Sequence, residues 1–235
     1  MTDTPTGMDH VKEQLLDAAM LHVPFDGWSE AAFRAAVADS GVELQLARAA
    51  CPRGGVDLAV AYHRRGDDEM ARRLNAVDLA EMRIRDKVAL AIRYRIEAVD
   101  DKEVVRRGAT LFALPQYASD GSRLVWGTAD RIWMALGDSS DDVNWYTKRA
   151  SLSAVYGATV LYWLGDETPG HQATWEFLDR RIENVMQFEK AKAQARKNWL
   201  LKPLLFGPNL IASQIRPPHA RPRLRMPGSL TPRTE

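Results

Sequence analysis

The chain has 235 residues, of which 46% are hydrophobic and 27% are charged, a composition typical of a folded globular protein rather than a disordered or fibrous one. Its single cysteine, Cys51, excludes an internal disulfide and favours a reducing compartment. The net charge of +1 is unevenly distributed, because residues 190–235 contain ten Lys/Arg and one acidic residue. A basic end on an acidic body predicts an anionic partner for that end.

The first 73 residues predict a helix-turn-helix-like arrangement of three short helices and a longer one. Val11 and Leu15 lie on the apolar face of a first helix that ends before Pro24. Ser29 is the expected N-cap of the second helix. A third helix is expected at residues 42–50, and a longer one at 55–73. No segment alternates with the period of two that is typical of strands, so the predicted fold class is all-α.

Longer helices are predicted in residues 74–190. An apolar stripe in 81–99 contains Ile84, Val88 and Ile92, and Arg95 falls on the same stripe. Further stripes with helical spacing lie within 125–136, 152–163 and 175–186. We therefore predict three units: a helix-turn-helix-like subdomain at 8–73, a helical ligand-binding and dimerisation domain at 74–190, and a basic amphipathic tail at 191–235 that is disordered at its end.

The motifs of most enzyme classes are absent from the sequence. It contains no glycine-rich nucleotide loop, no GxSxG and no HExxH, and no glutamate is followed by histidine three residues later. The five histidines are scattered along the chain and are not paired four residues apart. We therefore predict a non-enzymatic protein without a cofactor or a metal site.

The large apolar and aromatic side chains of the 81–190 helices are compatible with two structures. Either they fill a packed core, or they line a cavity between helices, where helical bundles bind apolar ligands. Periodicity does not distinguish these alternatives. The predicted lipid-binding residues are the following members of the stripes: Ile132, Trp133, Leu152, Tyr156 and Trp163.

The acidic segment that begins at Asp138 predicts a solvent-exposed turn that caps the following helix. It is followed directly by Trp145 and Tyr146, at a place where polar residues are more usual. Aromatic residues are enriched at binding surfaces, although one of the two is also expected to point into the core.

The most specific stretch of the sequence, residues 133–149 (WMALGDSSDDVNWYTKR), resembles the TetR-like lipid-binding accessory proteins of ubiquinone biosynthesis, the family numbered ninth in the coenzyme Q series. Shorter segments at 54–57, 84–88, 113–115 and 174–178 support this resemblance, which covers about residues 10–190.

The resemblance implies a TetR-like fold, a homodimer, and binding of isoprenoid lipids, including quinone intermediates. It also implies an interaction with a di-iron hydroxylase of the demethoxyubiquinone type. By the same resemblance, Asp142, Trp145 and Tyr146 are expected to lie at the surface that meets this hydroxylase.

A TetR-type, ligand-responsive transcription regulator is the alternative function. The helix expected to read DNA, at 42–50, contains only Glu43, Gln45 and Arg48 as base-reading candidates, and the surrounding body is acidic. This pattern is unfavourable for contacts with phosphates, so no nucleic-acid partner is predicted.

The segment 197–215 is apolar but interrupted by Pro203 and Pro208, and it is too short to span a bilayer. We predict that it lies on an anionic membrane surface; the alternative is that it packs on the body as another core helix. The side chains predicted to enter the membrane are Trp199, Leu200, Leu204, Leu205 and Phe206.

The first twenty residues contain four acidic side chains and no apolar stretch with basic flanks. We therefore expect neither a signal peptide nor a transit peptide. The expected location is the bacterial cytoplasm, peripheral on the inner face of the membrane, or the matrix side of the mitochondrial membrane for a eukaryotic protein.

Overall fold

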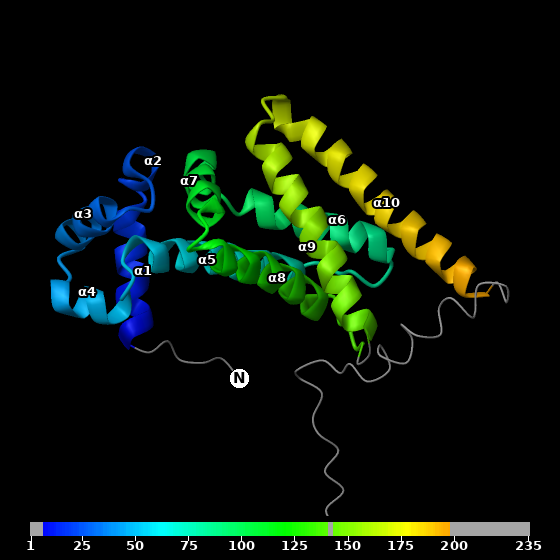
Figure 1. Cartoon of the computed structure of the whole chain (residues 1–235), viewed down its shortest axis with the longest axis horizontal. Coiled ribbons are helices and arrows are strands. Elements are labelled where there is room, and N and C mark those ends of the chain that lie inside the picture. The colour runs from blue at the N-terminus through cyan, green and yellow to red at the C-terminus, as the bar shows by residue number, and fades with distance from the viewer. Residues whose placement is uncertain (1–6, 141–142, 198–235) are drawn as a thin grey trace, which may run out of the picture.

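Helices make up all of the regular structure in the residues that the computed structural model describes, 7–140 and 143–197 (Figure 1). The predicted all-α fold is therefore confirmed. The α-helices are α1 (Gly7–Ala19), α2 (Val23–Asp26), α3 (Glu30–Ser40), α4 (Leu44–Ala50), α5 (Gly55–Asn75), α6 (Ile84–Glu97), α7 (Lys102–Ala113), α8 (Ala118–Ala135), α9 (Val143–Leu164) and α10 (Gln172–Lys197). A short 3-10 helix, η1 (Pro169–His171), precedes α10.

Local signals in the sequence explain several helix ends. The Ser29 hydroxyl accepts a hydrogen bond from the Ala32 amide at 3.1 Å, so the predicted N-cap of α3 is confirmed. The same helix ends at Gly41, whose φ of 68° is left-handed and favours glycine. Asp101 caps α7 in the same way, by accepting from the Glu103 amide at 2.7 Å.

The first hydrophobic cluster holds α1, α3, α4 and the beginning of α5 together. Leu15, Leu16 and Phe33 are fully buried at its centre, and small residues such as Ala32 and Ala36 allow the short helices to approach closely. Helix α4 begins at Leu44 rather than at the expected Val42, because Glu43 remains extended as its N-cap residue.

The second hydrophobic cluster lies between the end of α5 and helices α6, α8, α9 and α10. Helix α5 belongs to both clusters, and α8 runs alongside it (Figure 1). Helix α9 packs on α8, and α10 packs on α9 and α6. This arrangement leaves α7 at the junction of the two clusters, where it contacts α2, α8 and α9.

Two features of the fold were not predicted from the sequence. Helix α7 fills the stretch before the 125–136 stripe, and α10 continues to Lys197, seven residues beyond the predicted domain end at 190. None of the described helices is long and apolar enough to cross a bilayer.

Candidate functional site

A cavity of about 660 Å³ lies between helices α5, α6, α7, α8 and α9, and Trp28 also contributes to its lining. Its walls are mostly apolar: Phe112 comes from α7, Val125 from α8, and Val160 and Leu161 from α9. The volume falls in the range of roughly 300–1,000 Å³ that is typical of small-molecule sites. The alternative of a fully packed core is therefore excluded for this part of the bundle.

Helix α7 forms one wall of the cavity because its two faces differ in polarity. Val104, Val105 and Phe112 face the cavity, whereas the basic residues of the helix reach neighbouring backbone carbonyls. Lys102 Nζ donates to the Asp166 carbonyl at 2.6 Å, and Arg107 donates to the Pro24 carbonyl at 3.0 Å. The apolar positions 104, 105, 108, 111 and 112 have helical spacing, a signal that could have revealed this wall from the sequence.

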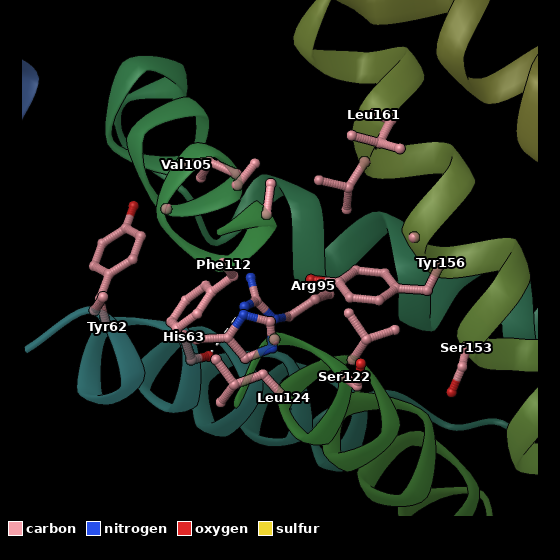
Figure 2. A pocket seen from close by; sticks show the side chains of 18 of the residues that line it. Tyr62, His63, Arg95, Val105, Phe112, Ser122, Leu124, Ser153, Tyr156 and Leu161 are labelled. Atoms are coloured by element: carbon pink, nitrogen blue, oxygen red, sulfur yellow. Dashed lines mark hydrogen bonds between the residues drawn. The ribbon is translucent and has the colours of Figure 1, made fainter. Parts of the chain in front are cut away.

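Polar side chains gather at one side of the cavity, against α5, α6 and α8 (Figure 2). Arg95 Nε donates to Asp67 Oδ1 at 2.6 Å, and the Thr128 hydroxyl donates to the same oxygen at 2.9 Å. Arg95 Nη2 donates to the His63 carbonyl at 3.0 Å, and His63 Nε2 lies 2.8 Å from Thr128 Oγ1. Tyr156 completes the group, since its ring lies 5.9 Å from the Arg95 guanidinium.

Burial controls the ionisation of this group. It lowers the pKa of His63 well below 6.5, and the charge of Arg95 acts in the same direction, so the ring is neutral at pH 7. Burial raises the pKa of Asp67, while the charge and the hydrogen bond of Arg95 oppose that rise. Burial also raises the pKa of Tyr62, on the opposite side of the cavity, to about 12. Of this group, Tyr156 was predicted from the sequence to bind lipid, and Arg95 was placed on an apolar stripe. His63, Asp67 and Thr128 were not predicted as site residues.

A second cavity, of about 450 Å³, lies between α6, α8, α9 and α10. Val88, Val155, Ile182 and Met186 contribute apolar surface, and the side chains of Arg85 and Lys148 also line this cavity. It is separate from the first cavity, because the two share none of their lining residues.

The predicted lipid-binding residues are divided between these cavities. Tyr156 and Trp163 line the first cavity, and Trp133 and Leu152 line the second. Ile132 is fully buried and lines neither of the two. Because α8 and α9 cross, residues of one apolar stripe lie next to different cavities. A stripe in the sequence therefore does not correspond to a single cavity.

The structure distinguishes the two aromatic residues at the start of α9. Trp145 is only 8% exposed and packs under the Arg149 guanidinium, 4.0 Å from its ring centroid. Tyr146 is half-buried and contacts the Trp145 ring edge-on at 4.8 Å. The third predicted partner-binding residue, Asp142, lies outside the described residues.

The turn before α9 was predicted to be solvent-exposed, and this is wrong for Asp138. Its side chain is 3% exposed and binds Lys148 at 2.7 Å and Arg149 at 3.0 Å. Burial alone would raise its pKa, but hydrogen bonds from Lys148, Ser140 and Arg149 lower it to about 2. Asp138 is therefore a buried anion that fixes the loop to α9, rather than a solvent-exposed cap of that helix.

Other candidate positions are structural or undescribed. Burial raises the pKa of the Cys51 thiol to about 11, which fits an apolar filler rather than a nucleophile. Within the described part of the chain, no three His, Cys, Asp or Glu side chains gather as a possible metal site. The predicted membrane-binding residues 199–206 lie outside the described residues.

Comparison with solved structures defines the class of fold. A TetR transcriptional regulator from Nitrosomonas europaea matches with a TM-score of 0.62 and 17% identity, over 76% of this chain and 99% of the regulator. The protein is an all-α protein with the TetR-like fold that was predicted.

Comparison with protein families and with individual proteins gives matches with higher sequence identity than the structural match. Residues 118–189 match the COQ9 family. The mitochondrial ubiquinone biosynthesis protein COQ9 of Drosophila melanogaster is 31% identical over 192 residues, 80% of this chain and 59% of that protein. Human COQ9 is 27% identical over 202 residues, again 80% of this chain and 61% of its own length. The chain thus spans about three fifths of these relatives. The match of residues 118–189 to the COQ9 family model agrees with the resemblance inferred from the sequence.

Proposed function

We propose that this protein is a lipid-binding accessory protein of ubiquinone biosynthesis, which holds an isoprenoid quinone intermediate in the cavity between α5 and α9. The cavity itself carries this proposal: it is large, mostly apolar, and has a few polar groups at one side. The similarity to ubiquinone biosynthesis proteins supports the class of ligand. In this proposal the protein presents its ligand to a di-iron hydroxylase and performs no reaction of its own.

Lipid extraction from protein purified without detergent tests the proposal. We expect an isoprenoid quinone or another long-chain lipid at near-stoichiometric amounts. Added decylubiquinone should also raise the melting temperature, since a ligand at a hundred times its dissociation constant stabilises the folded state by about 2.7 kcal/mol. Protein that yields no lipid and gains no stability from decylubiquinone would contradict the proposal.

The half-buried Tyr146 is the better candidate for contact with the hydroxylase, and the buried Trp145 supports it from beneath. Tyr146→Ala should weaken hydroxylase binding by about 2 kcal/mol while the melting temperature changes little. Trp145→Ala should lower the melting temperature as well, because it removes a packed ring. Unchanged hydroxylase affinity of both variants would remove this surface from the proposal.

The contacts of α4 support the proposal that this helix does not read DNA. Arg48, its one basic residue, forms an ion pair with Glu30 and stacks over the Phe33 ring at 4.5 Å. We therefore expect no retarded band with the protein's own promoter at physiological salt in the presence of competitor DNA. A specific, competitor-resistant band would favour the regulator instead.

The proposal also includes attachment to an anionic membrane through the basic tail at residues 191–235, and assembly into a homodimer. Removal of residues 197–235 should leave a folded protein that no longer floats with anionic liposomes. Loss of the thermal transition would favour packing of the segment on the body, and unchanged flotation would remove its role at the membrane.

A further inference from the structure

The polar group at the side of the first cavity is balanced in charge. Asp67 accepts hydrogen bonds from Arg95 and Thr128 on the same oxygen, Oδ1, and its pairing with the Arg95 guanidinium favours the ionised carboxylate. The side chains of Arg95 and Asp67 are 6% and 9% exposed, so their charges neutralise each other within the protein. Among the described residues, Arg95 is the one charged residue that lines the cavity, because the pKa of the neighbouring His63 is lowered well below 6.5 by burial.

Arg95 keeps one nitrogen available in spite of this pairing. Its Nε binds Asp67 and its Nη2 binds the His63 carbonyl, whereas Nη1 makes no hydrogen bond to any described residue. Figure 2 shows the guanidinium between the His63 and Tyr156 side chains, with the Tyr156 hydroxyl pointing toward it. This nitrogen keeps accessible surface in the residue that lines the cavity, so a ligand oxygen can accept its hydrogen bond.

The charge balance decides which ligand oxygen fits. A carboxylate or phosphate beside Arg95 would leave one uncompensated negative charge in a site of low dielectric constant, because Asp67 already neutralises the guanidinium. A carbonyl, ether or hydroxyl oxygen accepts the same hydrogen bond and adds no charge. The neutral state of His63 means that no second cation is present to offset an anion.

We propose that Arg95, held by Asp67, is the polar subsite of the cavity, and that it selects apolar ligands with an uncharged oxygen-bearing head over anionic lipids with the same tail. This inference rests on the proposed function, since it requires that the cavity holds an apolar ligand.

A matched pair of probes tests the selection. Farnesol and farnesoate share a tail and differ in the charge of the head at pH 8. Their dissociation constants can be measured by tryptophan fluorescence, because Trp28, Trp126 and Trp163 line the cavity. The wild-type protein should bind farnesol at least about tenfold more tightly than farnesoate. Asp67→Asn uncovers the charge of Arg95 and should shift this ratio toward farnesoate by about tenfold or more.

Glu97→Gln is the control for the change in charge. It removes one negative charge from the same helix as Arg95, but from an exposed ion pair with Arg93. Its affinity ratio should equal that of the wild-type protein. An equal shift in both variants would reveal a long-range effect of net charge and would overturn the subsite.

Tyr156→Phe keeps the proposal testable if Asp67→Asn does not fold. It removes only the hydroxyl that points toward Arg95, and should weaken farnesol binding about fivefold. Tyr62→Phe is its control, because that hydroxyl lines the cavity but points away from Arg95 (Figure 2). Equal effects of the two variants on farnesol affinity would contradict the assigned position of the head.

The possible outcomes separate the subsite from the proposed function. If farnesol and farnesoate bind equally well, or if Asp67→Asn leaves their ratio unchanged, the cavity binds lipids but Arg95 does not select the head. If neither probe nor decylubiquinone binds, the proposed function fails, and the subsite fails with it.

Discussion

The two hydrophobic clusters joined by α5 differ in what they bury. The first cluster, around Leu16 and Phe33, contains only apolar side chains at its centre. The second region contains all of the buried polar and charged residues in the described chain, among them Asp67, Arg95 and Arg149. Burying a charge is unfavourable unless it is paired, so such groups are retained where they position something. The first cluster thus supports the fold, whereas the buried polar groups of the second lie where we propose the binding site.

Removal of one partner of the buried ion pair should give the largest effect and would test this difference directly. Asp67→Ala leaves Arg95 buried without its counter-charge, so the free energy of unfolding should fall by about 3–5 kcal/mol. The double variant Asp67→Leu/Arg95→Met should recover most of that loss. Urea denaturation measures both. The exposed pair offers a control, since Glu97→Ala should cost less than about 1 kcal/mol.

A substitution that creates a cavity in the first cluster should lower the free energy of unfolding without changing the affinity for the ligand. Leu16 is fully buried, so Leu16→Ala should lower the free energy of unfolding by about 3 kcal/mol. Its affinity for farnesol, measured at a temperature where the variant is folded, should match the wild-type value. Weaker binding in this variant would show that the two clusters are coupled.

Substitution of either of two helical glycines should change the free energy of unfolding by an intermediate amount. A Cβ at Gly66 would lie 2.6 Å from Arg95 Nη1, so Gly66→Ala must displace the guanidinium and should cost about 2 kcal/mol. A Cβ at Gly127 on α8 meets nothing within 4 Å, so Gly127→Ala should instead stabilise the helix by about 0.5–1 kcal/mol. Thermal melts distinguish the two. A neutral Gly66→Ala would mean that Arg95 can move freely.

The pH dependence of stability gives the smallest expected effect. The unfolded chain protonates His63 near pH 6.5, whereas the folded chain does so only at much lower pH, so the unfolded state binds more protons in between. Stability should therefore decrease as the pH falls below about 6.5. His63→Gln should remove about 1 kcal/mol of this decrease between pH 7 and 5.5. An equal pH dependence of the two proteins over this range would show that folding does not lower the pKa of His63.

The sequence was sufficient for the features that depend on local pattern. Helical periodicity identified the all-α fold, and the Ser29 cap located the start of α3 within one residue. The distinctive residues 133–149 pointed to the family whose model matches residues 118–189. Such features depend on residues that are close to one another in the sequence, so the sequence alone is enough to predict them.

Only the tertiary structure decided which of these side chains share a site. The stripe residues Trp133 and Tyr156 line different cavities, because α8 and α9 cross and turn their faces in different directions. His63, Asp67, Arg95 and Thr128 are separated by up to 65 residues, and no local pattern connects them. Arg95 occupied an apolar stripe in the sequence, but its counter-charge lies on another helix. A buried charge is stabilised by whatever partner the packing brings to it, and that partner is determined by the fold as a whole.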